Sequence, residues 1–214
     1  MKTVKIILLS IVLGYDQFAF ADDNKYAEAM AKNIYTVYTS QSITDLQSAV
    51  NSLDRIGSSE KTKWEPYYYA AFGYIMMATK EKNAANKDVY LDQATAAAGK
   101  AKAVSASESE IVCLEGFIHM IRVTVDPVSR GQQYSGLAMQ AFGKASSLNP
   151  ENPRALALQA QMQYGTAKFF GSPTTEACTV LDAALKKFDS YKTENPLSPQ
   201  WGKEMALKLK KECK

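Results

Sequence analysis

Apolar side chains recur every three to four positions along most of the chain, and the alternation with period two that strands require is scarce. Residues that favour helices are abundant, among them Ala, Leu, Met, Lys, Glu and Gln. The pattern therefore predicts an all-α fold. The expected helices cover residues 26–38, 65–79, 89–104, 110–123, 134–148, 154–169, 175–190 and 199–213. A further helix, the second along the chain, is expected to follow a cap at Ser42 or Thr44 and to carry apolar residues from Leu46 to Ile56.

Proline and glycine mark where these helices are expected to begin and end. Pro66 suits a first helical turn, and the second helix is expected to end at Gly57. In the segment 149–153, Pro150 ends one helix and Pro153 opens the next. Longer connections, of the kind that is often functional or mobile, are expected at residues 80–87, 124–133 and 170–174.

The chain contains two copies of one pattern in which small and bulky residues follow each other at similar spacings. Such a repeated pattern is typical of a helix-turn-helix repeat of the tetratricopeptide type. Such repeats bury their faces only against their neighbours, so the ends of a stack need caps. We therefore expect a tetratricopeptide-like α-solenoid of about four helical hairpins. A final helix, with Ser198 as its cap, Pro199 in its first turn and Trp201 near its start, would close the stack. The two copies are Ala138, Phe142, Ala145, Pro150, Leu156, Ala160 and Ala94, Ala98, Ala101, Ala106, Val112, Gly116.

Four short segments carry a further resemblance. They are Trp64-Glu65-Pro66-Tyr67-Tyr68-Tyr69, Asn149-Pro150-Glu151-Asn152-Pro153-Arg154, Lys168-Phe169-Phe170-Gly171 and Pro199-Gln200-Trp201-Gly202-Lys203-Glu204. With them, nearly the whole mature chain resembles a family of periplasmic tetratricopeptide-repeat proteins of Bacteroidota. The resemblance implies a small exported helical solenoid, and it carries no activity over to these residues.

The first residues have the features of a secretory signal peptide. Lys2 and Lys5 precede an apolar run over 6–13, and small residues at 19–21 suit cleavage after Ala21. The alternative, a membrane anchor, needs about 20 apolar residues, and this run is much shorter. We expect a signal peptide over 1–21, a mature single domain over 22–214 and export, to the periplasm or beyond.

The charge distribution of the chain is not typical of a protein that binds nucleic acids or membranes. The formal net charge is +3, and the basic run over 208–211 falls in the last turns of an expected helix, where cations complement the helix dipole. No strongly basic amphipathic helix follows the signal peptide, so no stable membrane insertion is expected after cleavage. The oligomeric state is not indicated.

Three cysteines follow the signal peptide. Cys178 lies about twelve residues before the end of its helix, and Cys213 lies about thirteen residues after the start of the last helix. If these helices are antiparallel, equal rises of about 1.5 Å per residue place the two side by side. We therefore predict a Cys178–Cys213 disulfide, with three free thiols as the alternative. Cys113, in an apolar stretch, is expected to be a buried thiol rather than a reactive one.

The residues that catalysis or metal binding needs do not occur in a suitable pattern. His119 is the one histidine, and no cysteine or carboxylate lies at a spacing that completes a metal site with it. Glu108 and Glu110 flank a helix start, where acidic residues complement the dipole without any catalytic role. We expect no enzyme, no metal and no cofactor.

The first helix of each hairpin is expected to line a concave face. Tyr, Phe, Met and Arg are enriched in recognition surfaces, although aromatic residues at helical spacing are also typical of a core. The candidate partner-binding residues are Tyr35, Tyr38, Tyr67, Tyr74, Met77, Phe117, Met120, Arg154, Gln161 and Tyr164.

Two functions fit these expectations. The first is an exported scaffold that binds a protein or peptide partner through its concave face. The alternative is a periplasmic carrier of a small ligand, a sugar or a lipid. A large void closed by the 124–133 connection would favour the carrier, and an open concave surface would favour the scaffold.

Overall fold

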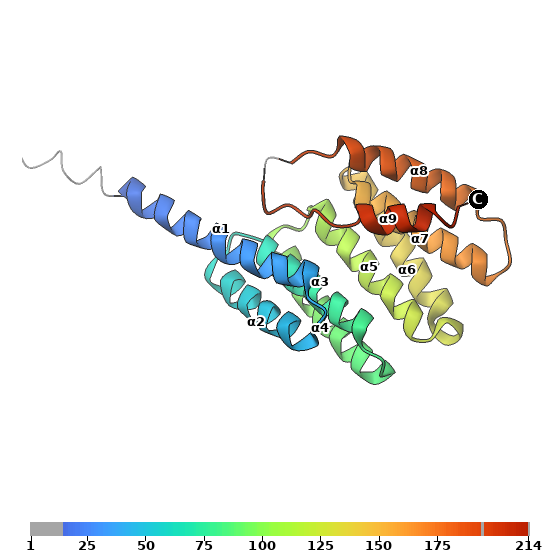
Figure 1. Ribbon diagram of the computed structural model, residues 1–214, viewed down its shortest axis with the longest axis horizontal. Coiled ribbons are helices and arrows are strands. Elements are labelled where there is room, and N and C mark those ends of the chain that lie inside the picture. Colours follow the sequence, from blue (N-terminus) through green and yellow to red (C-terminus); the bar gives the residue numbers. More distant parts are fainter. Residues whose placement is uncertain (1–14, 194, 214) are drawn as a thin grey trace, which may run out of the picture.

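The computed structural model describes residues 15–193 and 195–213, and for residues 15–23 only the course of the backbone (Figure 1). The described chain contains nine helices and no strand. Their bounds are α1 Tyr15–Thr39, α2 Ile43–Ser59, α3 Glu65–Lys80, α4 Ala84–Val104, α5 Ser109–Val125, α6 Pro127–Leu148, α7 Pro153–Phe169, α8 Thr175–Ser190 and α9 Lys203–Lys210. The all-α prediction is confirmed.

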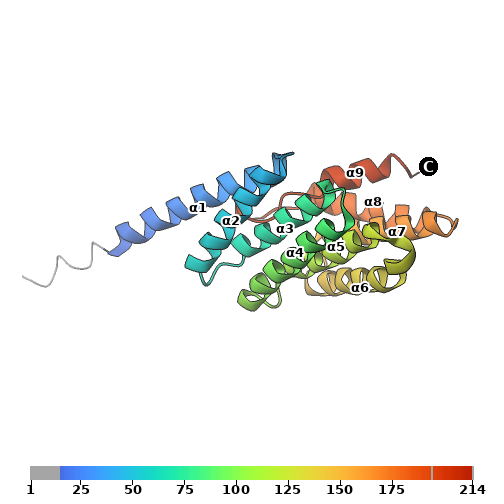
Figure 2. The ribbon, with the colours of Figure 1, turned by 90° about the horizontal axis from the view of Figure 1, so that it is seen from below.

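The helices pack in sequential antiparallel pairs, from α1–α2 at one end of the stack to α7–α8 at the other (Figure 2). The first helices of the pairs also contact one another, because α3 touches both α1 and α5, and α5 touches α7. They form an inner row with the second helices outside it. The last helix, α9, lies against α7 and α8. Four hairpins and a closing helix are thus present as expected.

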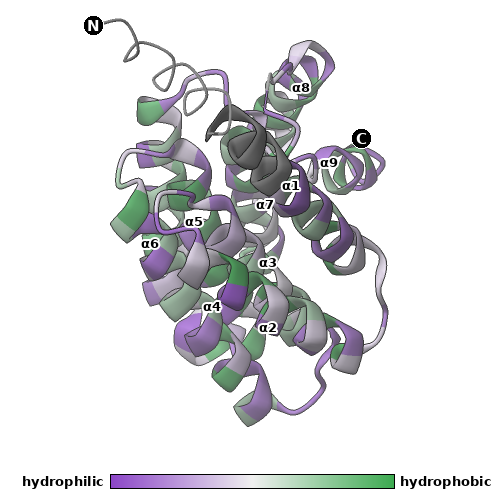
Figure 3. Cartoon of the chain, turned by 90° about the vertical axis from the view of Figure 1, so that its left-hand side faces the viewer, coloured by the Kyte–Doolittle hydropathy of each residue, from purple (hydrophilic) through white to green (hydrophobic). Residues whose placement is uncertain are grey.

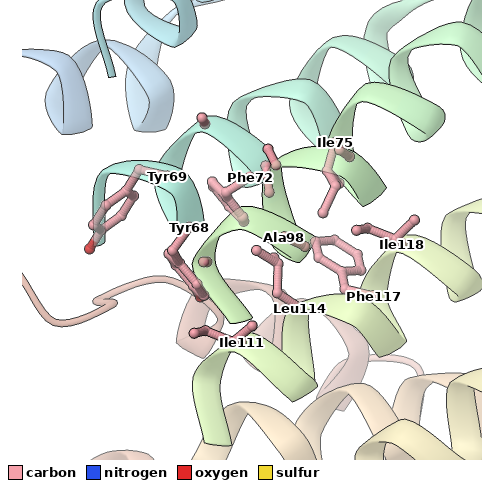
Figure 4. Close-up of a cluster of buried hydrophobic side chains, with 14 of the residues drawn as sticks. Tyr68, Tyr69, Phe72, Ile75, Ala98, Ile111, Leu114, Phe117 and Ile118 are labelled. Carbon is pink, nitrogen blue, oxygen red and sulfur yellow. The ribbon is translucent and has the colours of Figure 1, made fainter. Parts of the chain in front are cut away.

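Small residues at the helix contacts let the pairs approach closely. An added Cβ at Gly116 would lie 2.5 Å from Phe142, and one at Gly73 would lie 2.5 Å from Val50. The core between α3, α4 and α5 is filled by aromatic and branched side chains that point toward one another (Figure 4). Hydrophilic and hydrophobic residues are interspersed along the helices on the side of the molecule that Figure 3 shows.

The helix starts follow the capping rules closely. The Ser42 hydroxyl accepts a hydrogen bond from the Asp45 amide, and the Asn152 side chain accepts from the amides of Arg154 and Ala155. Pro66 and Pro153 both lie in a first helical turn, as expected.

The predicted connection over 124–133 is wrong. α5 continues to Val125 and α6 begins at Pro127, so one residue, Asp126, separates them. The Asp126 side chain caps α6 by accepting from the Ser129 amide, and Pro127 occupies the first turn. An Asp-Pro pair that looks like a break is here a helix start. No loop is present to close a void. The connection expected at 80–87 is also shorter, since Asn83 caps α4 and the helix begins at Ala84.

The start of the last helix also differs from the prediction. α9 begins at Lys203, after Gly202, whose φ of 105° suits glycine. Ser198, Pro199 and Trp201 therefore precede the helix and belong to the segment that leads to it.

α1 begins at Tyr15 and so includes the last residues of the expected signal peptide. Residues 1–14, with most of that expected peptide, lie outside the described residues. None of the helices in the described part of the chain is both long enough and apolar enough to cross a membrane.

Candidate functional site

The segment that joins α8 to α9 returns across the inner row of helices (Figure 1). We call residues 195–202 the strap. Asn195 donates from Nδ2 to Glu65 Oε1 on α3 at 2.8 Å, and Arg154 on α7 donates from a guanidinium nitrogen to the Trp201 carbonyl at 3.3 Å. The strap thus contacts both the middle and the end of the inner row.

Two tyrosines fix the middle of the strap through a continuous chain of hydrogen bonds. The Gln200 amide donates to the Tyr38 hydroxyl at 3.2 Å, which donates to the Tyr69 hydroxyl at 3.3 Å, which donates to the Leu197 carbonyl at 2.8 Å. The chain begins and ends on the strap. Burial raises the pKa of both hydroxyls, so both remain protonated donors at neutral pH.

Trp201 is the main apolar contact of the strap. Its ring stacks against Phe72, with centroids 4.8 Å apart, and against Phe117, with centroids 5.4 Å apart. Its indole nitrogen donates to the Tyr68 hydroxyl at 2.9 Å. The ring is therefore part of the main core.

A buried ion pair lies next to Trp201. Arg154 donates two hydrogen bonds to the carboxylate of Glu110, at 2.8 and 2.7 Å, and its guanidinium lies over the ring of Tyr191. Burial raises the pKa of the Glu110 carboxyl, and the hydrogen bonds and charge of Arg154 oppose that shift. Glu110 was expected only to complement a helix dipole. In the structure its carboxylate accepts hydrogen bonds from Arg154, which also donates to the Trp201 carbonyl of the strap.

The ten candidate partner-binding residues are distributed over these surroundings. Met77, Phe117, Met120 and Arg154 are buried, Tyr35 is 70% exposed, and the other five are half-buried. Tyr38, Phe117 and Arg154 contact the strap. Tyr164 donates to the Glu212 carbonyl near the C-terminus. The inner row is therefore covered over much of its length by the chain's own strap and α9.

The predicted disulfide is confirmed. Cys178 and Cys213 are joined, with Cα atoms 5.8 Å apart, and the bond ties the end of the chain to α8. Cys113 is buried, as expected, and burial raises the pKa of its thiol well above its ordinary value.

His119 lies on α5 with its ring stacked on Tyr134 of α6, centroids 6.0 Å apart. Burial lowers its pKa, so the imidazole is neutral at pH 7. Within the described residues, no three His, Cys, Asp or Glu side chains are grouped as a metal site.

A groove of about 410 Å³ opens between α6, α7 and the start of α8, and we call it the tip groove. Phe170 stands at its edge, 73% exposed, and packs edge-to-face on Phe169, which is 58% exposed. The two rings together form an exposed apolar surface beside the groove, and contiguous exposed apolar surface is a common feature of binding sites. The lining residues are Ser135, Gly136, Met139, Gln163, Thr166, Ala167, Phe170, Ser172, Pro173, Glu176 and Ala177.

Two of the lining residues leave room or bonding capacity for a ligand. An added Cβ at Gly136 would meet no atom within 4 Å, so the α6 backbone is open to the groove. Gln163 Oε1 is buried and has no hydrogen-bond partner in the described chain. Met139 lies one turn after Gly136 and is partly buried against the main core.

A larger hollow, of about 790 Å³, lies between α1 and α2, but its lining is polar. Hydroxyl and amide side chains dominate it, with Lys32 and Asp45 at its charged positions and Ala49 as its apolar residue. Such a surface suits the outer end of a helical stack, which needs a polar face.

No protein-family model matches this chain, and no curated protein matches it. A comparison with solved structures gives a clear result. The chain is similar to the HusA haemophore from Porphyromonas gingivalis. The TM-score is 0.78 and the sequence identity is 28%, over 88% of this chain and 92% of that one.

The likeness to HusA agrees with the fold and with the expected group of bacteria, since Porphyromonas belongs to the Bacteroidota. A haemophore is a binding protein and not an enzyme, which agrees with the expectation that this chain has no catalytic activity. The finer assignment to tetratricopeptide repeats stays a prediction.

The sequence did not single out the tip groove. Its lining comes from two helices of different hairpins and from the start of a third helix, so no single stretch carries a pattern. One signal was present, because two adjacent phenylalanines occur in a segment that the sequence predicts to be near a turn.

Proposed function

We propose that this chain is an exported carrier that binds haem in the tip groove. The observation that carries the proposal is the structural match to a haemophore over 88% of the chain. This proposal develops the carrier alternative of the sequence analysis, with haem in place of a sugar or lipid.

The size and chemistry of the tip groove support a flat, largely apolar ligand. Its volume of about 410 Å³ falls within the roughly 300–1,000 Å³ typical of ligand pockets. Phe170 offers a ring face for stacking, and Ala167, Pro173 and Ala177 add apolar surface. The hollow between α1 and α2 has no aromatic residue in its lining, and Ala49 is its one aliphatic residue.

The residues would share the work of binding as follows. Phe170 would stack on a face of the macrocycle, and Gly136 would leave space for the ring beside the α6 backbone. The Gln163 side-chain amide, whose oxygen lacks a partner, and Ser172 are placed to meet the polar groups of the ligand. Iron would supply coordination chemistry when haem is bound.

Export is part of the proposal. The expected signal peptide, the Cys178–Cys213 disulfide and the likeness to a haemophore all support a mature chain over 22–214 that acts outside the cytoplasm. A carrier of this kind captures its ligand there and delivers it to another component of the cell surface.

The experiment uses two glycines of α6 as a matched pair. Gly136 lines the tip groove and Gly143 does not, yet both are exposed and neither has an atom within 4 Å of an added Cβ. Leucine favours a helix over glycine by about 1 kcal/mol, so both substitutions are expected to leave the fold intact. The mature chain, Gly136→Leu and Gly143→Leu are titrated with haem, and binding is followed by absorbance.

We expect Gly136→Leu to weaken haem binding at least about tenfold, which is about 1.4 kcal/mol, and Gly143→Leu to bind like the parent. If no form binds haem, the proposed function is wrong. If all three bind haem equally, haem binds elsewhere on the chain.

Binding of a protein partner through the concave face is the second candidate function. The strap and α9 lie over much of the inner row, so a partner would need either to displace them or to use exposed residues such as Tyr35.

A further inference from the structure

We propose that the connection between α7 and α8 is a docking surface for an anionic lipid bilayer, with the rings of Phe169 and Phe170 entering the headgroup region. We call these two phenylalanines the aromatic tip. The proposal goes beyond haem binding, because it concerns the outer surface of this end of the stack and is measured on the protein without haem.

The aromatic tip is an exposed apolar surface on a projecting turn. Phe169 ends α7, Phe170 caps it, and Gly171, with a φ of 66°, turns the chain toward α8. The turn projects at the end of the stack opposite to α1 (Figure 1). The two rings pack edge-to-face on each other, with centroids 5.1 Å apart, and both residues are more than half exposed. Contiguous apolar surface of this kind marks contact sites for proteins or membranes.

The C-terminal segment lies beside this turn. Cys213 is joined to Cys178, which lies in the first turns of α8, and Tyr164 near the end of α7 donates to the Glu212 carbonyl at 3.3 Å. Figures 1 and 2 both show the end of the chain on the same side of the stack as the connection between α7 and α8. The side chains of this segment therefore belong to the surroundings of the aromatic tip.

Lysines give these surroundings a positive charge. The basic run over 208–211 was expected to complement the dipole of its helix. In the structure Lys210 pairs with Asp182, whereas Lys208 and Lys211 are exposed and form no ion pair with any described residue. The same holds for Lys168, which directly precedes the aromatic tip. Three lysines thus remain available to an anionic partner.

This charge favours a bilayer over a second copy of the chain. The exposed carboxylates nearby are those of Glu176 and Glu212, and the three available lysines outnumber them. A symmetric contact between two copies would place the same lysines against each other, which is unfavourable. An anionic bilayer instead offers phosphates to the lysines and an apolar layer to the rings. Aromatic and basic side chains together are the combination that binds at membrane surfaces.

The position of the tip groove gives this contact a consequence. Phe170 belongs both to the aromatic tip and to the lining of the groove. A bilayer that holds the aromatic tip would therefore lie next to the opening of the groove. A flat apolar ligand dissolved in the lipid would then enter the groove with little exposure to water.

The experiment measures binding of the mature chain, without haem, to vesicles by co-sedimentation. One set of vesicles is phosphatidylcholine alone, and the other is phosphatidylcholine with phosphatidylglycerol in a three-to-one ratio. The parent is compared with Phe169→Ser/Phe170→Ser and with the control Val89→Ser/Leu148→Ser. The control removes two exposed apolar side chains from α4 and from the far end of α6. Circular dichroism verifies that each variant is folded.

We expect the parent to bind the vesicles that contain phosphatidylglycerol and to bind phosphatidylcholine much less. Phe169→Ser/Phe170→Ser should bind at least about tenfold more weakly, and the control should match the parent. Lys168→Gln/Lys211→Gln should also lose roughly tenfold, because each lysine near an anionic surface contributes to binding. Added salt should weaken the parent more than this lysine variant.

A fluorescent side chain at the aromatic tip reports the contact directly. In Phe170→Trp the emission of the new indole is expected to shift to shorter wavelength when vesicles with phosphatidylglycerol are added, since the ring leaves water. Val89→Trp, at another exposed apolar position, should show no such shift. This readout does not depend on the folding of the serine variant.

Three results would overturn the proposal. The first is a parent that binds neither kind of vesicle, and the second is equal binding by the parent and Phe169→Ser/Phe170→Ser. The third is self-association of the parent in sedimentation velocity that the same variant loses, which would assign the aromatic tip to a second copy of the chain. None of these results bears on the haem titration of Gly136→Leu, so the proposed function is judged separately.

Discussion

The indole nitrogen of Trp201 donates a hydrogen bond to the hydroxyl of Tyr68 at 2.9 Å, across 133 positions of the sequence. Both side chains are buried, Tyr68 completely. This bond joins the strap to the inner row of helices at the centre of the molecule. The core of the protein therefore holds the strap in place, and the Cys178–Cys213 disulfide holds the segment that follows it.

The first prediction concerns Trp201. Replacement by alanine removes the stack on Phe72 and Phe117 and is expected to lower the free energy of unfolding by about 3–5 kcal/mol. Trp201→Phe keeps a ring but leaves the Tyr68 hydroxyl without its donor, which is expected to cost about 1–3 kcal/mol. Urea unfolding followed by circular dichroism measures both values. Equal stability of the parent and Trp201→Ala would mean that the strap does not contribute to the core in solution.

The second prediction concerns the ion pair of Arg154 and Glu110. Arg154→Met leaves a buried carboxylate without its partner and is expected to cost about 3–5 kcal/mol at neutral pH. The double variant Arg154→Met with Glu110→Leu should recover much of that loss, because no buried charge is left. Chemical unfolding of both variants provides the comparison. A double variant less stable than Arg154→Met alone would contradict it.

The second prediction also has a consequence for the pH dependence of stability in Arg154→Met. Burial raises the pKa of Glu110, and removal of Arg154 takes away the main opposing influence. The folded state of Arg154→Met should then bind a proton that the unfolded state releases near its ordinary pKa of about 4.3. Relative to the parent, the variant is therefore expected to lose stability as the pH rises above that value, up to the raised pKa of the folded state. Unfolding curves from pH 4 upward test this, and a loss of relative stability toward acid would have the wrong sign.

The third prediction concerns the disulfide. Replacement of Cys178 and Cys213 by serine opens a loop with a sequence separation of 35 and is expected to cost about 3–4 kcal/mol on the chain-entropy model. The loss should fall first on α9, because this short helix packs mainly against α7 and α8 at the end of the stack. Hydrogen exchange resolved by residue would show faster exchange in α9 than in α3 or α5. Uniform change across all helices would contradict the expected local effect.

The fourth prediction uses two glycines with positive φ. Gly202→Ala places a Cβ 3.0 Å from Phe188 and 3.1 Å from Arg154, whereas Gly171→Ala meets no atom within 4 Å. Both changes strain the backbone by roughly 1–3 kcal/mol, and Gly202→Ala adds a steric conflict at the start of α9. Thermal unfolding should therefore rank Gly202→Ala below Gly171→Ala. The reverse order would mean that the close approach at Gly202 is absent in solution.

The fifth prediction addresses a protein partner of the concave face. Tyr74 and Tyr164, on α3 and α7, are half-buried rather than buried, so their replacement by alanine should leave the fold intact. Crosslinking in the native cell envelope compares the parent with this double variant and with Trp201→Ala, which loosens the strap. If the concave face is the binding site, the double variant loses a captured partner and Trp201→Ala captures more of it. A partner kept by every variant would lie on another face.

The hairpins could be predicted from the sequence because each is a local pattern. Apolar residues at helical spacing, and the prolines at 150 and 153, give the turn between α6 and α7 correctly. The disulfide was also predictable, because antiparallel helices advance by equal rises and bring Cys178 and Cys213 together even though α9 is shorter than expected.

The strap and the tip groove could not be predicted in the same way. Residues 195–202 have no helical or strand period of their own, and their positions are set by partners as distant in sequence as Tyr38 and Glu65. The connection over 124–133 was misjudged because Asp126 and Pro127 favour both a turn and a helix start, and only packing between α5 and α6 decides between them. The groove depends on how α6, α7 and α8 diverge, which no local pattern records.

The strap also limits how this protein can change in length. An open helical stack can gain or lose a repeat by duplication or deletion, because each unit meets only its neighbours. Here the segment before α9 must reach from α8 back to Tyr38 on α1 while Trp201 meets Tyr68 on α3. One additional hairpin would move α8 away from both tyrosines and leave a tryptophan and a guanidinium without their partners. The number of hairpins is therefore fixed by the reach of the chain's own C-terminal segment.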